Sequence, residues 1–252
     1  MAKLYVVGIG PGDAARLTAQ ADAALRRAEV ICGYTVYVDL VAPRYPGKEY
    51  LTTPMRRETE RCRLALERAR EGKTVAMVCS GDAGVYGMAG PVLELSGDYP
   101  EVEVEIVPGV TAALAGAALA GAPLGNDFCV ISLSDLLTPW ETIERRLRFA
   151  SLAGFAICLY NPGSHRRTDH LRRACAVLLE NLPGDTVCAV TRSIGREGES
   201  KTITTLSEVY KMQVDMFTTI FIGTSETKCL GETMVTPRGY PQQGPEKGKN
   251  DD

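Results

Sequence analysis

Short apolar runs that end in glycine-rich loops alternate with helix-forming segments, and this alternation most restricts the fold of the chain. Segments that predict helices lie between the apolar runs, and Thr18 is the expected N-cap of the first of them. The expected strands are 4–9, 30–32, 74–79 and 102–107, and the expected helices are 18–28, 56–71, 85–95 and 111–120. Strands that alternate with helices of this length predict an α/β domain with a largely parallel sheet.

The second half of the chain has a different spacing. The expected strands are 129–132, 155–160, 186–191, 201–205 and 219–222, and the expected helices are 139–150 and 166–179. The short interval at 195–200 predicts a hairpin, so this half should form a mixed sheet. Pro123, Gly125 and Asn126 interrupt both patterns. We therefore predict two α/β domains at 1–122 and 123–236, followed by a polar, disordered tail at 237–252.

Composition excludes several classes of protein. The 252 residues carry 28 Lys and Arg against 31 Asp and Glu, and this net charge of −3 argues against a dedicated nucleic-acid binder. There is no run of 18 apolar residues that would predict a membrane span, and residues 1–13 predict a strand entering a loop rather than a signal peptide. Eight cysteines without a C-x-x-C pair, beside two histidines, predict reduced core thiols in a cytoplasmic protein and no metal site.

The first glycine-rich loop, 8–13 (GIGPGD), lies between a predicted strand and helix. It resembles a dinucleotide fingerprint by position, but Asp13 stands where the third glycine belongs. Pro11 lacks the backbone N–H that a phosphate needs, and Asp13 adds negative charge at the start of a helix. We therefore reject a pyrophosphate site. A tight turn and a loop that contacts another ligand both remain open.

Two further loops, 80–87 (SGDAGVYG) and 108–112 (PGVTA), also follow predicted strands. Ligands of open α/β sheets bind at the carboxyl ends of strands, where all three loops should meet. Asp82 offers a carboxylate, and the glycines permit close approach of a ligand to the backbone. The alanines of 111–120 allow either close packing or room for a flat adenosine. Together these features favour a nucleoside without phosphates.

The three loops, in this order and spacing, resemble those of the tetrapyrrole methyltransferases. Segments 33–37 (GYTVY), 132–140 (SLSDLLTPW), 160–164 (YNPGS) and 236–240 (TPRGY) narrow the resemblance to the ring-contracting subgroup that methylates C(17). The resemblance covers about residues 3–240, and 132–140 discriminates best between subgroups. It implies a cytoplasmic homodimer in which S-adenosylmethionine binds in a cleft between the two domains. The implied cofactor contacts are Pro11, Gly81, Asp82, Val85, Thr111, Ala112, Asn161 and Thr219.

Ring contraction needs proton transfers, whereas methyl transfer needs chiefly positioning. We name Tyr34, Asp135 and His165 as catalytic candidates, each of which could instead pack or cap. The resemblance implies that the substrate is precorrin-3B or its cobalt counterpart, a tetrapyrrole with several carboxylates. Tyr37, Arg166 and Arg167 are the candidates that would bind it. Members of the resembled family that methylate uroporphyrinogen have a Tyr-Asp pair where this chain has Gly33-Tyr34, so the base proposed for them is absent here.

Two alternatives remain open. One is another corrin-ring methyltransferase, of the C(11) or C(20) type. The other is a tetrapyrrole-binding protein that keeps the fold but has no catalytic activity. The intact Gly81-Asp82 and Thr111-Ala112 pairs argue against a pure carrier, because such a protein needs no nucleoside pocket.

Overall fold

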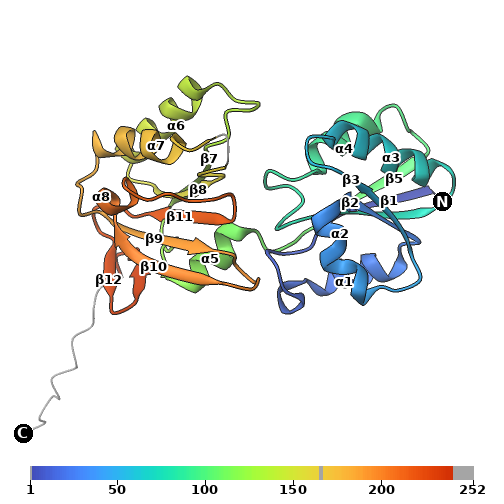
Figure 1. Cartoon of the computed structure of the whole chain (residues 1–252), viewed down its shortest axis with the longest axis horizontal. Helices are drawn as coiled ribbons and strands as arrows, with labels where there is room; N and C mark the ends of the chain where they lie inside the picture. The colour runs from blue at the N-terminus through green and yellow to red at the C-terminus, as the bar shows by residue number, and fades with distance from the viewer. Residues whose placement is uncertain (1, 165–166, 241–252) are drawn as a thin grey trace, which may run out of the picture. The chain divides into compact units, whose positions relative to one another are not determined.

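The structure is a computed structural model that describes residues 2–164 and 167–240. The chain divides into two compact units, Met1–Gly116 with Arg192–Ser200, and Ala117–Thr191 with Lys201–Asp252 (Figure 1). The first unit therefore includes a short segment, Arg192–Ser200, that comes from much later in the sequence. The predicted boundary at 122/123 remains a prediction, and most of the predicted tail lies outside the described residues.

The first unit is built on a five-stranded sheet of order β3-β2-β4-β1-β5, in which all neighbouring strands are parallel. Its strands are β1 (Ala2–Gly8), β2 (Val30–Tyr34), β3 (Glu49–Thr53), β4 (Thr74–Cys79) and β5 (Val102–Val107). Its helices are α1 (Ala19–Arg27), α2 (Thr35–Val41), α3 (Glu58–Arg70), α4 (Ala89–Ser96) and the start of α5 (Ala112–Ala120). Short 3-10 turns occupy Ala14–Arg16 and Ala42–Arg44. The predicted parallel α/β domain is confirmed.

Alternating residues of the strands form two cores, one on each face of the sheet. Leu4 and Val6 of β1 pack with α3 and α4, whereas Tyr5 and Val7 pack with α1 and α2. This period of two follows from the pleat of a strand. A strand that is covered on both faces must be apolar throughout, which explains the continuous apolar runs of β1 and β4.

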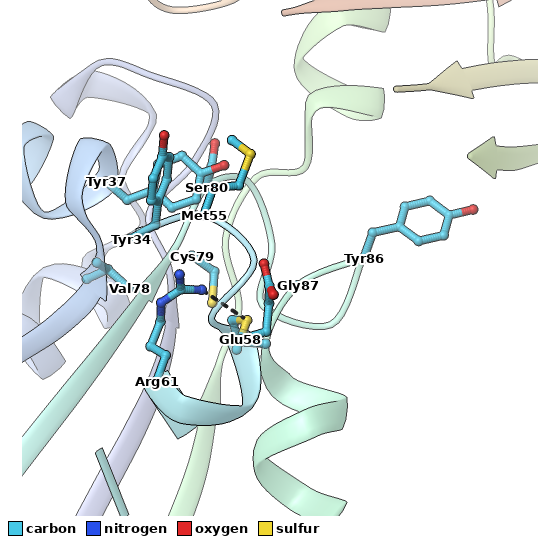
Figure 2. A pocket seen from close by; sticks show the side chains of 11 residues that line it. Tyr34, Tyr37, Met55, Glu58, Arg61, Val78, Cys79, Ser80, Tyr86 and Gly87 are labelled. Atoms are coloured by element: carbon cyan, nitrogen blue, oxygen red, sulfur yellow. Dashed lines mark hydrogen bonds between the residues drawn. The ribbon is translucent and has the colours of Figure 1, made fainter. Parts of the chain in front are cut away.

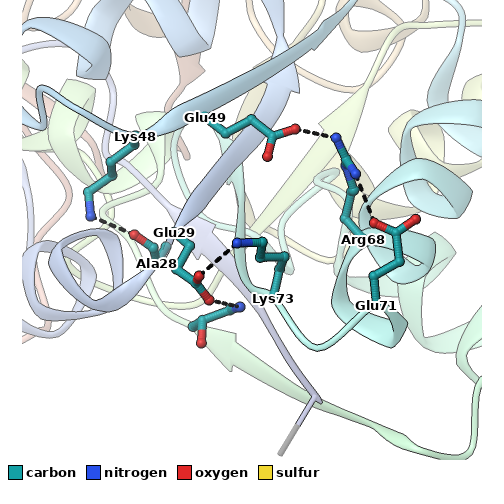
Figure 3. A network of polar contacts seen from close by, with 8 residues as sticks. Ala28, Glu29, Lys48, Glu49, Arg68, Glu71 and Lys73 are labelled. Carbon is teal, nitrogen blue, oxygen red and sulfur yellow. Dashed lines mark hydrogen bonds and ion pairs between the residues drawn. The ribbon is translucent and has the colours of Figure 1, made fainter.

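Ion pairs and hydrogen bonds connect charged side chains near the amino-terminal ends of the strands. The Glu29 carboxylate accepts hydrogen bonds from the Thr74 N–H (2.9 Å) and the Lys73 ammonium (3.1 Å), while Arg68 contacts both Glu49 and Glu71 (Figure 3). These residues lie at or beside the first residues of β2, β3 and β4. These charged side chains are paired with one another, whereas the glycine-rich loops lie at the opposite, carboxyl ends of the strands.

The second unit contains a mixed sheet of order β10-β9-β11-β8-β7, as predicted. Strands β7 and β8 are parallel, and β8 and β11 are antiparallel. These strands are β7 (Phe128–Ser132), β8 (Ala156–Tyr160), β9 (Val187–Arg192), β10 (Ser200–Thr205) and β11 (Thr218–Ile222). A smaller sheet holds β6 (Gly121–Ala122), β12 (Lys228–Leu230) and β13 (Thr233–Val235). Helices α6 (Trp140–Leu152), α7 (His170–Leu179) and α8 (Leu206–Val209) supply the core residues that pack against the larger sheet.

Two helices begin four residues later than predicted. Helix α4 begins at Ala89 rather than at 85, because Tyr86 has a φ of 53° and the Asp82 carboxylate accepts a hydrogen bond from Gly84. Helix α7 begins at His170 rather than at 166. The Thr18 N-cap is confirmed, since its side chain accepts a hydrogen bond from the Ala21 N–H. No helix in the described part of the chain is both long and apolar enough to cross a membrane.

Candidate functional site

Three loops meet at the carboxyl ends of β1, β4 and β5 in the first unit. Gly10 and Gly81 exchange backbone hydrogen bonds of 3.0 and 2.7 Å, which join the loops after β1 and β4. The Asp82 carboxylate then accepts hydrogen bonds from Gly84 in its own loop (2.8 Å) and from Gly109 in the loop after β5 (2.9 Å). Asp82 thus joins two loops through its own side chain.

Glycine is required where these loops touch. A Cβ atom on Gly109 would lie 2.2 Å from the Gly81 carbonyl oxygen, and one on Gly8 would lie 2.7 Å from the same atom. Gly81 adopts a φ of 69°, yet a Cβ there would approach nothing closer than Thr111 Cα at 3.6 Å. Gly81 therefore faces Thr111 across ordinary van der Waals distance, whereas Gly8 and Gly109 are packed against backbone.

The other predicted cofactor contacts of the first unit lie around this junction. Pro11 is buried, and its carbonyl oxygen accepts a hydrogen bond from Arg196 Nε (3.1 Å). Val85, Thr111 and Ala112 are partly exposed. Arg196 Nη2 also reaches Ser80 Oγ at 3.3 Å, so the segment Arg192–Ser200 contacts the loops after β1 and β4.

A pocket of about 190 Å³ opens beside these loops, at the carboxyl ends of β2, β3 and β4. Tyr34 and Tyr37 contact edge to face, with their ring centroids 5.2 Å apart. Burial raises the pKa of the Tyr37 hydroxyl. Figure 2 shows both rings above the Arg61 guanidinium, while Tyr86 points away from the other lining side chains. The structure thus brings together a predicted catalytic residue and a predicted substrate-binding residue.

Arg61 is a residue that the sequence analysis missed. It was part of a predicted helix, and its neighbours Arg63, Arg68 and Arg70 belong to the solvent-facing side of α3. Arg61 is instead 4% exposed. Its spacing was the available signal, because Arg61, Ala65 and Ala69 recur every four residues and so share the buried face of α3.

Polar side chains also gather at the ends of β7 and β8 in the second unit. Asn161, with a φ of 54°, donates a hydrogen bond from Nδ2 to Ser132 Oγ (2.9 Å). Arg167 Nη1 donates to Ser134 Oγ (3.1 Å), while its Nε finds no acceptor within the described residues. Thr219 is buried within β11, where its carbonyl oxygen accepts a hydrogen bond from Thr191.

Asp135 lies in the same cluster and pairs with a histidine that was not predicted. His170 Nε2 is 3.0 Å from Asp135 Oδ2, and the buried His170 ring contacts Trp140 edge to face. The His170 imidazole beside it lowers the pKa of the Asp135 carboxyl. The predicted residues His165 and Arg166 lie outside the described part of the chain. No group of three or more His, Cys, Asp or Glu residues able to hold a metal occurs in residues 2–164 and 167–240.

The chain is a two-unit α/β protein: one unit has a parallel sheet covered on both faces, with glycine loops at the strand ends, and the other has a mixed sheet. The chain belongs to the tetrapyrrole (corrin/porphyrin) methylases, whose family matches residues 3–210. It is therefore a methyltransferase of this family, which confirms the resemblance found in the sequence.

Individual relatives resemble the chain over nearly its full length. A probable cobalt-factor III C(17)-methyltransferase of Salmonella typhimurium is 48% identical over 94% of this chain and 99% of the relative. The precorrin-3B C(17)-methyltransferase of a Sinorhizobium species is 42% identical over 94% and 96%. The crystal structure of the methyltransferase CobJ has a TM-score of 0.87 at 38% identity, covering 94% of this chain and 100% of that one.

Proposed function

We propose that the protein transfers a methyl group from S-adenosylmethionine to C(17) of precorrin-3B or its cobalt counterpart, with contraction of the ring, in cobalamin biosynthesis. The observation that carries this proposal is the near full-length similarity to relatives named for C(17) methylation. The expected cytoplasmic location and homodimer are part of the same proposal. Light scattering on the purified protein would test the dimer.

The loops of the first unit fit a nucleoside cofactor. They place backbone and small side chains around Gly81, and Asp82 adds a carboxylate, which would repel a phosphate. In the proposed site Pro11, Gly81, Asp82, Val85, Thr111 and Ala112 would contact S-adenosylmethionine, with Asn161 and Thr219 as the candidates of the second unit. The bound cofactor supplies a methyl group on a sulfonium, which is a good leaving group.

The remaining tasks fall to this chain's own residues. Methyl transfer requires that the acceptor carbon be held at near-attack distance and that water be excluded, so no triad or metal is needed. Ring contraction additionally requires a group that holds and moves a proton. Asp135 beside His170 and the Tyr34 hydroxyl are the candidates in the described residues, and His165 remains a candidate from the sequence.

The test is to incubate the protein with S-adenosylmethionine carrying a ¹³C-labelled methyl group and with either precorrin-3B or cobalt-factor III. We expect nuclear magnetic resonance to place the label at C(17) of a contracted ring. A label at C(11) or C(20) would assign the protein to another corrin-ring methyltransferase. Tight binding of the tetrapyrrole without any transfer would indicate a binding protein without catalytic activity.

A further inference from the structure

Arg61 is a buried cation without an anionic partner. Its side chain makes hydrogen bonds to the Thr53 hydroxyl (Nε, 2.8 Å), the Pro54 carbonyl oxygen (Nη2, 3.1 Å) and the Met88 sulfur (Nη1, 3.7 Å). All three acceptors are neutral, and no carboxylate in the described part of the chain lies within 4.0 Å of the guanidinium. Burying a charge is costly unless it is paired, so buried arginines ordinarily face a carboxylate or a phosphate.

The structural roles open to Arg61 do not account for a charge at this position. A guanidinium carries five N–H donors, and the hydrogen bonds found use three of them. Arg61 also lies in the first turn of α3, where the helix dipole disfavours a cation. A neutral side chain could pack on the face that Arg61 shares with Ala65 and Ala69 at lower cost.

The surroundings of Arg61 indicate where an anion would bind. Arg61 lines the pocket with Tyr34, Tyr37 and Ser80, at the carboxyl ends of the strands where the glycine loops also lie (Figure 2). Ser80 opens the loop that carries Gly81 and Asp82. A volume of about 190 Å³ holds a carboxyalkyl arm but not a macrocycle. The carboxylate of Glu58 lies at the same pocket but is exposed, and its Oε1 accepts a hydrogen bond from the Arg56 N–H (3.2 Å).

We infer that Arg61 binds one carboxylate arm of the tetrapyrrole substrate, with the rings of Tyr34 and Tyr37 beside that arm, and thereby sets the register of the macrocycle relative to the cofactor loops. This inference rests on the proposed function. Arg suits the task because its planar fork can donate two parallel hydrogen bonds to one carboxylate. S-adenosylmethionine also carries a carboxylate, so the experiment has to separate the two ligands.

The experiment compares Arg61→Met, Arg61→Lys and the parent protein. Absorption titration measures binding of cobalt-factor III and of the same macrocycle with its carboxylates converted to amides, and calorimetry measures binding of S-adenosylhomocysteine. For Arg61→Met we expect the Kd for cobalt-factor III to rise on the order of 10- to 100-fold, as for loss of a charged hydrogen bond. We expect its Kd for the amide form and for S-adenosylhomocysteine to match the parent, and Arg61→Lys to show a smaller loss.

Arg57→Met is the matched control, because Arg57 is exposed at the start of the same helix and pairs with Glu60 (3.1 Å). It removes one positive charge and should leave all three affinities unchanged. A purely structural role for Arg61 would weaken the acid and amide forms equally, and that result would overturn the inference. An equal loss of S-adenosylhomocysteine affinity would assign the carboxylate to the cofactor and also overturn it.

Two outcomes separate this inference from the proposed function. If the parent methylates cobalt-factor III while Arg61→Met binds it as the parent does, the inference fails and the function stands. If the parent transfers no methyl group to any tetrapyrrole, the proposed function fails. If Arg61→Met does not fold, Arg61→Lys is the deciding variant. If Arg61→Lys binds both the acid and the amide form of the macrocycle as tightly as the parent does, a bidentate guanidinium is not needed and the inference fails.

Discussion

The Asp82 carboxylate accepts a hydrogen bond from the Gly109 N–H at 2.9 Å, and this contact joins the loops after β4 and β5. The other oxygen of the same carboxylate accepts from Gly84 at 2.8 Å. Asp82 was expected from the sequence to offer its carboxylate to a ligand. In the structure both of its oxygens also accept hydrogen bonds from the loops that would bind that ligand.

Asp82→Asn should therefore affect both stability and cofactor binding. The amide leaves one oxygen acceptor and places an N–H₂ group where a backbone N–H donor already points. We expect the free energy of unfolding to fall by about 1–2 kcal/mol, the size of a hydrogen bond to a charged group that is partly exposed. Binding of S-adenosylhomocysteine should weaken at least roughly tenfold by calorimetry. Asp98→Asn, on an exposed loop, is the control, and parental binding by Asp82→Asn would place the cofactor elsewhere.

Gly109→Ala tests the close approach of the three loops. A Cβ on Gly109 would lie 2.2 Å from the Gly81 carbonyl oxygen and 2.6 Å from the Gly8 carbonyl carbon, so the loops would have to separate. We expect a loss of about 1–3 kcal/mol in urea unfolding, as for overpacked sites, together with weaker cofactor binding. Gly90→Ala is the matched substitution, because no atom outside its own stretch of α4 lies within 4 Å of its Cβ position.

Gly90→Ala should leave the protein unchanged or stabilise it by up to about 1 kcal/mol, since alanine favours a helix. If Gly109→Ala and Gly90→Ala have the same free energy of unfolding and the same cofactor affinity, the loops tolerate a Cβ at Gly109 and the prediction is wrong.

The strands and the sheet class were predictable because buried parallel strands leave a strong signal. Predicted and observed ranges of β4 and β5 coincide. Strand β4 is a continuous buried apolar run, whereas β5 (VEVEIV) alternates apolar residues with Glu, and both patterns are typical of strands. Strand β3 was missed because its sequence, EYLTT, is polar and lies at the sheet edge. Helix α2 was missed because TVYVDLV is rich in β-branched residues, and packing of Val38 and Val41 outweighs that propensity.

The site was predictable only where local sequence determines it. Positions packed against backbone, such as Gly109, can be found from the sequence because only glycine fits there. The Asp135–His170 pair joins residues from different elements, and nothing in the sequence alone places them 3.0 Å apart. Arg61 was hidden among the arginines of a charged helix, although its spacing from Ala65 indicated the buried face.

The cysteines give a test of the fold that does not depend on function. Burial raises the pKa of the thiols of Cys32, Cys79 and Cys175 to about 12 and of Cys62 and Cys129 to about 11. It also raises the pKa of Cys158 and Cys188. Cys229 is the exposed thiol, Cys129 is half-buried with a raised pKa, and the other six are buried. Because the thiolate is the reactive form, iodoacetamide at pH 8 should modify Cys229 quickly and the buried thiols only after unfolding.

Intact mass measurement should therefore show one rapid adduct on the native protein and eight in guanidinium chloride, matching the eight cysteines. Cys229→Ser should remove the rapid adduct and leave seven after unfolding. Several rapid adducts on the native protein would contradict the burial of the core thiols.

The Asp135–His170 pair predicts a stability contribution that depends on pH. The His170 imidazole 3.0 Å away lowers the pKa of Asp135 in the folded protein, so the folded state binds a proton there less readily than the unfolded state. The pair therefore stabilises the protein above the ordinary carboxyl range near pH 4, and this contribution is lost as the pH falls through the lowered pKa. Because the Asp135 side chain is 41% exposed, solvent screening limits the gain to about 1 kcal/mol at most.

Asp135→Asn should then be less stable than the parent in urea at pH 7, and the difference should close as the pH is lowered below 4 for as long as both proteins remain folded. Asp127→Asn, an exposed carboxylate in the same unit, should show no difference at either pH. If the difference in free energy of unfolding between Asp135→Asn and the parent stays constant down to acid pH, Asp135 stabilises the protein by packing or by a hydrogen bond that does not depend on its charge. The pair would then be a poor candidate for moving protons during ring contraction, and Tyr34 or His165 would take its place.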